Sequence, residues 1–221
     1  MQTLNNIKIL GISGTARSGK NLFADIAGNV LKEKYNKTSK SFALAYYLKK
    51  DCEEFIKQKL NMDVWSEITD EKNVFRPLLV WYGGVKRKQT NGRYWIEMLQ
   101  KDLEKSNADV NIITDIRYSI YDKDEVYWIK NELNGKLIHL SKYSFIGVKT
   151  NRFQQPQQKK VYVEPANDQE MINDPIVKRN SDIQVEWEDA SARTHDMYSL
   201  ALKDEILVNT VKDALVKILD E

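Results

Sequence analysis

The segment GTARSGKN, residues 14–21, has the residue types and the spacing of a phosphate-binding loop. The usual pattern is Gly, four further residues, Gly-Lys, and then Ser or Thr. Backbone N–H groups in such a turn bind phosphate oxygens, and Lys20 places a cation beside the β- and γ-phosphates of a nucleotide. We therefore predict a nucleotide site made of Gly14, Thr15, Ala16, Arg17, Ser18, Gly19, Lys20 and Asn21.

Three residues are candidates for the chemistry of phosphoryl transfer. Asp115 follows the apolar run Val110 to Thr114, and an acidic residue at the end of a buried strand commonly holds Mg²⁺ in such enzymes. Arg117 could grip a phosphate at the same sheet edge. The alternative is an Asp that caps the next helix and an Arg paired on the surface. We expect Lys20, Asp115 and Arg117 to be catalytic, with Asp115 and Asn21 as the metal-binding positions.

Asn21 is the unusual member of the loop, because Ser or Thr usually stands there and contributes a hydroxyl to Mg²⁺. An Asn side chain offers an amide oxygen instead. Metal coordination by this residue is therefore the least secure part of the predicted site.

The segment FRPLLVWYGGVKRKQTNGRYWIEML, residues 75–99, is dense in arginine and aromatic residues. Guanidinium groups suit a phosphate, and aromatic faces can stack on a base. Aromatic residues at helical spacing are nevertheless more often part of a core. Three arginines, which include Arg93, still indicate a site for a second substrate. Its expected residues are Arg76, Arg87, Trp81, Tyr82, Trp95 and Arg117.

These side chains need a scaffold, and the first half of the sequence predicts one. Residues 7–12 are a short apolar run, typical of a buried strand, and after Lys20 apolar residues recur at helical spacing for roughly four turns. Residues 40–60 begin with a few strand-like residues and continue as a helix. Residues 70–88 and 93–105 predict two more helices, with breaks expected at Gly83-Gly84 and Asn91-Gly92.

The second half continues the alternation of strands and helices. Strands are expected at 110–114, 136–141 and 182–187, and helices at 122–135, capped by Gly135, and 197–219. Such alternation predicts a parallel sheet covered by helices on both faces, an α/β fold. Between about 142 and 180 the pattern fails, apart from KVYV at 160–163. So long a polar insert is more often a lid, in which Arg152 and Arg179 are candidate phosphate contacts.

Bulk properties limit the remaining possibilities. A chain of 221 residues suits one domain, with a core at about 5–141 and 181–221, an acceptor-binding helical region at about 43–105 and the insert. A net charge of +2 argues against a surface dedicated to nucleic acid. The single Cys52 reads as a core residue. Neither a run of about 18 apolar residues nor an export signal is recognisable, so no membrane association is expected.

Several motifs, taken in order, resemble the deoxynucleoside monophosphate kinases encoded by bacteriophages. They are GISGTARSGKN, SFA, RPLLVWYGGVKR followed by RYW, TDIRY, and DPIVKRNSDIQVEW, which together span most of the chain. The resemblance implies a P-loop nucleoside monophosphate kinase fold with a core, an acceptor-binding region and a lid. Members of the family often carry Asp after the loop lysine, where this chain has Asn21.

The resemblance implies transfer of the γ-phosphoryl group of ATP to a deoxynucleoside monophosphate (dNMP), with Mg²⁺ as cofactor. Gly14 to Lys20 then match the phosphate loop, Asp115 and Arg117 the strand-end pair, and Arg76 and Arg87 the acceptor region. ATP and a dNMP are the expected partners, in the cytoplasm, that of the host cell if the protein is phage-encoded. A P-loop ATPase acting on nucleic acid and a non-catalytic nucleotide-binding module remain alternatives. The accepted bases and the oligomeric state, a homodimer included, stay open.

Overall fold

The computed structural model describes residues 8–148, 157–195 and 197–219, which form an α/β fold around one mixed sheet. The six-stranded sheet has the order β2-β3-β1-β4-β5, and β6 also pairs with β4. The strands are β1 (Ile9–Ser13), β2 (Ser39–Ala43), β3 (Val110–Ile116), β4 (Lys136–Val148), β5 (Gln157–Tyr162) and β6 (Ile183–Glu188). All pairs are parallel except β4 with β5. The prediction of a wholly parallel sheet is thus wrong for β5, the return strand of a hairpin.

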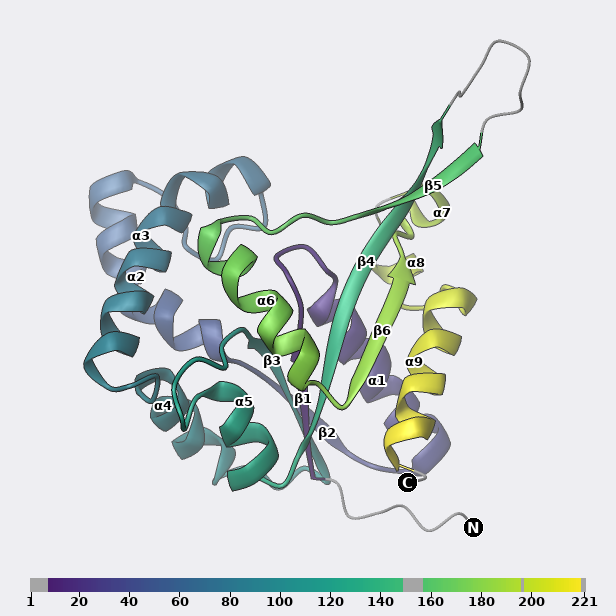
Figure 1. Cartoon of the computed structure of the whole chain (residues 1–221), viewed down its shortest axis with the longest axis horizontal. Helices are drawn as coiled ribbons and strands as arrows, with labels where there is room; N and C mark the ends of the chain where they lie inside the picture. The colour runs from purple at the N-terminus through teal and green to yellow at the C-terminus, as the bar shows by residue number, and fades with distance from the viewer. Residues whose placement is uncertain (1–7, 149–156, 196, 220–221) are drawn as a thin grey trace.

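Helices cover both faces of the sheet (Figure 1). The longer helices are α1 (Lys20–Tyr35), α2 (Leu44–Leu60), α3 (Thr69–Gln89), α4 (Tyr94–Leu103), α6 (Asp168–Asn180) and α9 (Glu205–Leu219). The shorter ones are α5 (Glu125–Tyr127), α7 (Ser191–Thr194), α8 (Tyr198–Ala201) and the π-helical turn η1 (Trp128–Glu132).

Side-chain alternation along the central strand β1 divides the core in two. Leu10 and Ile12 pack with α1 and α9, whereas Ile9 joins the cluster formed with α4, α5 and η1. Burying each such side chain stabilises the fold by about 1.5–3 kcal/mol. Position 11 of this strand has little room for a side chain, because a Cβ there would come within 3.1 Å of Ile129. The strand that leads into the phosphate loop is therefore held rigidly on both faces.

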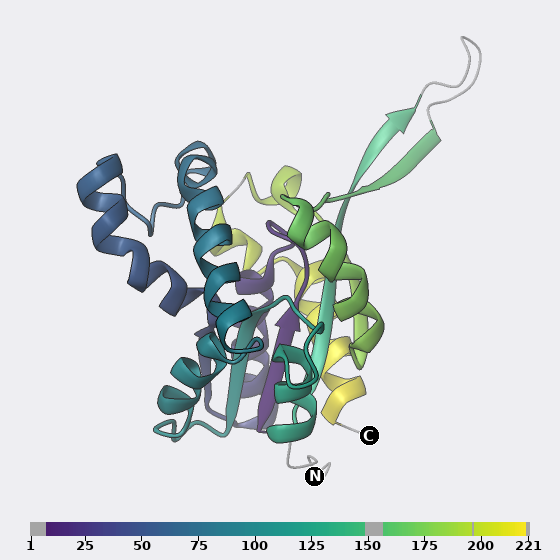
Figure 2. The same cartoon turned by 60° about the vertical axis from the view of Figure 1, so that its left-hand side comes forward.

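Helices α2 and α3 form a lobe beside the sheet (Figure 2). Cys52, Ile56, Val64 and Phe75 make its separate apolar core, so the prediction of a core Cys52 is confirmed. The predicted break at Gly83-Gly84 is wrong, because α3 continues through both glycines to Gln89. The chain turns instead at Asn91 and Gly92, which have positive φ angles of 50° and 88°.

The polar region after residue 141 contains more regular structure than the sequence predicts. Strand β4 continues to Val148 and pairs with β5, and together they project from the body as a two-stranded ribbon (Figures 1 and 2). Helix α6 follows and packs onto the body through the buried Val177. The prediction that KVYV is the only regular element of this region is therefore wrong.

Two predicted helices also end differently in the structure. The sequence predicts a helix capped by Gly135, but η1 ends at Glu132 and Asn134 has the positive φ angle of 48°. The predicted helix 197–219 is divided into α8 and α9, because Asp204 starts a new helix by accepting a hydrogen bond from Leu207 N (3.1 Å).

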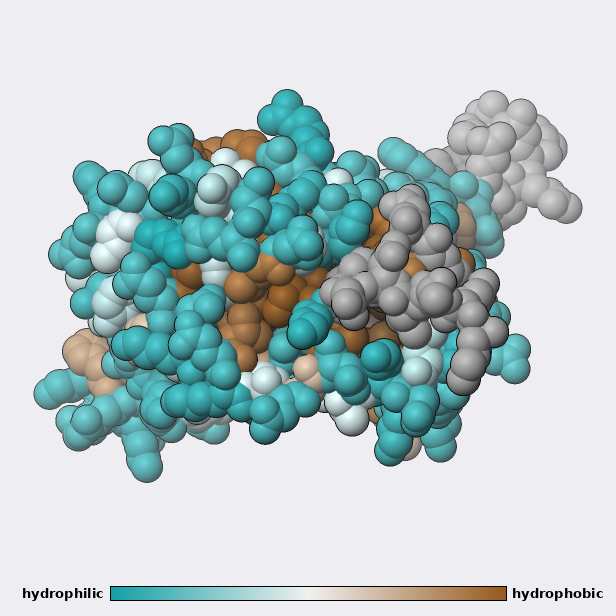
Figure 3. Space-filling view, turned by 90° about the horizontal axis from the view of Figure 1, so that it is seen from below, coloured by the Kyte–Doolittle hydropathy of each residue, from teal (hydrophilic) through white to brown (hydrophobic). Residues whose placement is uncertain are grey.

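The surface carries no helix that could cross a membrane, as far as the described residues go. Seen from below, the molecule shows apolar residues in the middle of the face and hydrophilic residues around them (Figure 3).

Candidate functional site

The loop after β1 has the backbone geometry that its two glycines allow. Gly14 and Gly19 have positive φ angles of 132° and 86°. A Cβ at Gly14 would lie 2.5 Å from the carbonyl oxygen of Leu140, and one at Gly19 would lie 2.4 Å from the indole of Trp187. Neither position has room for a side chain, so both glycines are required by the fold of the loop.

Trp187, which the sequence analysis did not single out, supports this loop from below. Its indole Nε1 donates a hydrogen bond to the carbonyl of Ser18 (2.8 Å), and its ring packs edge-on against Phe23 of α1. The residue stands at the end of β6 and is buried. Strand β6 therefore helps to position the loop through the contacts of Trp187.

Lys20 is the first residue of α1, and its ammonium group lies inside the curve of the loop. It donates hydrogen bonds to the carbonyls of Gly14 (3.1 Å) and Thr15 (2.8 Å) and lies 3.6 Å from Asp115 Oδ1. Burial, together with the nearby Arg117, lowers the pKa of Lys20 to about 8, although Asp115 and Glu170 favour the charged form. The ammonium is thus cationic at neutral pH and already at the position where phosphate charge is expected.

Asp115 reaches the site through a bulge in β3. Gly11 pairs with Ile113 but Ser13 pairs with Ile116, so β3 contains one extra residue at this point. Asp115 has a positive φ angle of 65°, a conformation that is costly for a residue with a side chain and common at functional sites. Burial acts to raise the pKa of Asp115, but Lys20 and Arg117 hold it below its usual range. The carboxylate is therefore ionised next to the loop.

Arg117 completes a group of four charged side chains. Its guanidinium lies 3.6 Å from Asp115 Oδ1 and forms a close ion pair with Glu170 of α6. Glu170 also accepts a hydrogen bond from the loop amide of Ala16 (3.0 Å). We name Lys20, Asp115, Arg117 and Glu170 the open cluster, because they line the main cavity and join the loop, β3 and α6.

The main cavity has a volume of about 550 Å³ and two kinds of wall. The open cluster and the loop form the charged wall. Helices α2, α3 and α4 form the other wall, which is largely apolar and includes Leu44, Leu48, Phe75, Leu79 and Trp95. Arg76 lines this part as well and donates to Asn73 Oδ1 (3.1 Å). One space therefore joins the predicted phosphate loop to the predicted acceptor region.

Gly84 leaves room in the apolar wall. It lies within α3 and lines the cavity, and a Cβ added there would meet nothing within 4 Å. Glycine inside a helix costs about 1 kcal/mol relative to alanine. The packing of the protein gives no reason for this glycine, whereas a ligand that approaches the helix backbone would need the space.

Arg87, a predicted acceptor-phosphate ligand, borders the cavity and is largely buried. The side chain is only 6% exposed and pairs with Asp124 (2.8 Å to both carboxylate oxygens) and Glu125 (2.8 Å). Its guanidinium also lies 3.7 Å from the ring centroid of Tyr118. We name Arg87, Asp124 and Glu125 the closed cluster. Although Arg87 borders the cavity, its guanidinium forms ion pairs with two buried carboxylates.

The remaining predicted acceptor residues and Asn21 differ in whether they line the cavity. Trp95 is buried and borders the cavity. Trp81 is 64% exposed and does not line the cavity. Tyr82 does not line it either, because it packs against Trp95 and donates a hydrogen bond to Asp51. Asn21 is exposed at the cavity mouth.

The two predicted lid arginines have different outcomes. Arg179 is exposed near the end of α6 and does not line the cavity. Arg152 lies outside the described residues.

Glu170 is the functional candidate that the sequence analysis missed. The sequence does carry a signal for it, because Asn167 followed by Glu170 has the spacing of a helix-capping pair. Asn167 indeed caps α6 by accepting a hydrogen bond from Glu170 N (3.0 Å). The contact of Glu170 with the loop, 154 residues away, has no local signal.

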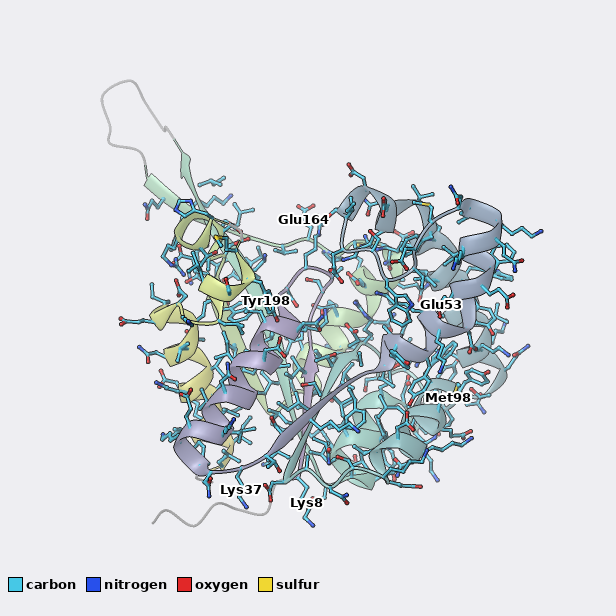
Figure 4. All side chains as sticks on the ribbon, turned by 180° about the vertical axis from the view of Figure 1, so that it is seen from behind. Lys8, Lys37, Glu53, Met98, Glu164 and Tyr198 are labelled. Carbon is cyan, nitrogen blue, oxygen red and sulfur yellow. The ribbon has the colours of Figure 1, made fainter. Side chains whose placement is uncertain are left out.

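A second, smaller hollow of about 160 Å³ adjoins the end of the loop and the first turn of α1. Trp187 and Asp189 border it, together with Gly19, Leu22 and Tyr198, which also border the main cavity. Tyr198 lies over α1 and donates a short hydrogen bond to Asp25 (Figure 4). The two spaces therefore meet at the start of α1.

The donor set for a metal ion is sparse. Across residues 8–148, 157–195 and 197–219, no group of three or more His, Cys, Asp or Glu side chains is arranged to hold a metal. Asp115 is ionised beside the loop, so a Mg²⁺ ion would be held by this carboxylate, by phosphate oxygens and by water, which suits its coordination chemistry.

Comparison of the chain with protein-family models and with curated proteins found no match.

Proposed function

We propose that the protein is a deoxynucleoside monophosphate kinase that transfers the γ-phosphoryl group of ATP to a dNMP. One observation carries this proposal: the phosphate loop and the apolar wall of α2, α3 and α4 border the same cavity, with Arg117 on the charged side. In such an arrangement the phosphates of two nucleotides, one bound at the loop and one at the apolar wall, would face each other. In-line placement of two anions is the main requirement of phosphoryl transfer.

The residues of the open cluster supply the charges that the reaction needs. Lys20 and Arg117 would neutralise the oxygens of the transferred group, and Asp115 would help to hold a Mg²⁺ ion, which would supply further positive charge. A dNMP phosphate is already ionised at neutral pH, so no general base is needed. The base of the dNMP would lie against the apolar wall, with Arg76 near its phosphate.

The second hollow suits the base of ATP, because it adjoins the loop at Gly19 and Leu22 and, among the described residues, its lining contains no residue of α2, α3 or α4. The connection that carries Glu164 crosses above the loop between β5 and α6, and α6 itself borders the main cavity (Figures 1 and 4). Closure of this region over the substrates would exclude water and limit wasteful hydrolysis of ATP.

A panel of dNMPs tests the proposal. Each dNMP is incubated with ATP and Mg²⁺, and the formation of dNDP and ADP is measured with the purified protein. We expect equal amounts of both products with at least one dNMP. ADP release without dNDP, stimulated by DNA, would instead indicate an ATPase that acts on nucleic acid. Nucleotide binding without turnover would indicate a binding module.

A further inference from the structure

Glu170 places a carboxylate where the phosphate loop offers its donors. Oε2 accepts hydrogen bonds from the amides of Ala16 (3.0 Å) and Ala166 (3.0 Å), while Oε1 pairs with the guanidinium of Arg117. The side chain is 9% exposed. Burial acts to raise the pKa of Glu170, but Arg117 and the two amides hold it below its usual range. An anion of the protein itself is therefore bound to the tip of the loop.

These donors are of the kind that bind phosphate oxygens in proteins, namely loop amides and an arginine. Lys20 and Arg117 bring two positive charges to this place, and Asp115 and Glu170 bring two negative ones. A nucleotide phosphate that entered the cluster would add negative charge beside Glu170. A carboxylate and a phosphate at contact distance repel each other, so a phosphate that takes the Arg117 and Ala16 donors now bonded to Glu170 must displace that carboxylate.

We propose that the Glu170 carboxylate occupies the position of an incoming phosphate, competes with it for Arg117 and the Ala16 amide, and turns away when the nucleotide binds. The competition presupposes the proposed function, because the competing ligand is a nucleotide phosphate. The charge balance of the cluster then lowers the affinity of the loop for phosphates, and the nucleotide must displace Glu170 from its partners to bind.

Helix α6 can release this side chain without unfolding. Its cap is the side chain of Asn167, which bonds to the backbone of Glu170 and not to the carboxylate. Further along the helix, Asp174 forms a hydrogen bond with the buried His139 of β4 (3.0 Å), and Val177 is buried in the core. A rotation of the Glu170 side chain, or a small shift of the first turn, is sufficient to free Arg117.

The test compares the binding of inorganic tripolyphosphate and ATP to the parent protein and to Glu170→Gln by calorimetry. Gln keeps the size of the side chain and removes its charge, so we expect a roughly tenfold lower Kd for both probes. Asp168→Asn removes one charge from the same turn of α6 at an exposed position, and its Kd should match that of the parent. Glu170→Asp, whose shorter carboxylate cannot reach both the loop and Arg117, should give an intermediate Kd and guards against a folding defect in Glu170→Gln.

Unchanged or weaker binding in both Glu170 variants, with thermal unfolding like that of the parent, would show that Glu170 is a structural clamp and would overturn the competition. If the parent forms dNDP in that case, the proposed function stands and only the competition fails. If neither the parent nor the variants bind tripolyphosphate or ATP, both proposals fail.

Discussion

Two arginines border the same cavity, but they differ in burial and in their ion-pair partners. The side chain of Arg87 in the closed cluster is 6% exposed, and its guanidinium is held at 2.8 Å by two buried carboxylates. The side chain of Arg117 in the open cluster is 28% exposed, and it is shared between Asp115 at 3.6 Å and the carboxylate of Glu170. Residue type and position on the cavity wall are therefore insufficient to identify a phosphate ligand, because the partners of each arginine decide its role.

The closed cluster also positions the open one. Glu125 Oε2 accepts hydrogen bonds from the backbone amides of Arg117 (2.7 Å) and Tyr118 (3.1 Å), while its other oxygen binds Arg87. Burial raises the pKa of Glu125 to about 7, against the effect of Arg87. The buried arginine thus stabilises the carboxylate that fixes the chain on which the exposed arginine stands.

The largest expected effect belongs to the open cluster. Lys20→Met should lower kcat for dNDP formation by roughly a thousandfold, because the ammonium stabilises charge that develops on the transferred group. Thermal unfolding should change little. The matched control is Lys32→Met at an exposed position of the same helix, which should keep the parent kcat. Near-normal turnover of Lys20→Met would remove this loop from the reaction.

A substitution in the closed cluster should lower the free energy of unfolding. Arg87→Met leaves Asp124 and Glu125 buried without their cation, and this should lower the free energy of unfolding by about 3–5 kcal/mol in urea titrations. Arg93→Met provides the contrast, since the Arg93–Glu132 pair is partly exposed and should contribute about 1 kcal/mol or less. A normally stable Arg87→Met with a raised KM for dNMP alone would make Arg87 an acceptor ligand after all.

The pH dependence separates the two clusters further, because Lys20 titrates in the alkaline range and the arginines do not. The ammonium form exists below its pKa of about 8, so kcat/KM for ATP should fall above pH 8, by about tenfold per pH unit. The unfolded chain binds this proton up to about pH 10.5, so the contribution of Lys20 to stability should rise between pH 8 and 10.5 while activity falls. A Lys20→Arg variant should lose the alkaline limb of the profile. If the limb persists in that variant, another group causes it.

The smallest effect concerns Gly84, which stands one turn before Arg87 on α3. Gly84→Ala should stabilise the protein by up to about 1 kcal/mol, since alanine is the better helix former and its Cβ meets no atom. The same methyl group should raise KM for dNMP several-fold by narrowing the cavity. Thermal unfolding and dNMP titrations measure the two opposite changes. A stabilised variant with unchanged KM would show that the substrate does not approach this wall.

The parts of the molecule that local sequence patterns encode could be predicted. Strand β1, the glycine loop, helix α1 and strand β6 follow from apolar periodicity and glycine spacing, and their positions match the expectation. Asp115 and Arg117 could be placed at a strand end, and the structure brings both next to Lys20. The bulge that turns Asp115 toward the loop could not be predicted, because it depends on pairing with β1.

Other features depend on partners far away in the chain. Gly83-Gly84 does not interrupt α3, since packing of this helix against Leu48 and Trp95 outweighs the low helix propensity of glycine. Helix α6 buries only Glu170, Asn173 and Val177, so it lacks the apolar stripe that reveals a helix in sequence. The ion pairs of Arg87 could not be predicted either, because its partner carboxylates lie 37 and 38 residues away in the sequence.

The central position of β1 has a consequence for the order in which the protein folds during synthesis. Both neighbours of β1 follow it by about a hundred residues or more, since Ile9 pairs with Asn111 and Ser13 pairs with His139. At about 5–20 residues per second, a ribosome needs on the order of ten seconds to make the chain between them. The apolar strand and its glycine loop remain unpaired for that time. Chaperones that hold exposed strands should therefore bind the nascent chain most strongly between the emergence of β1 and that of β4, and loss of such chaperones should lower the yield of folded protein more than its stability.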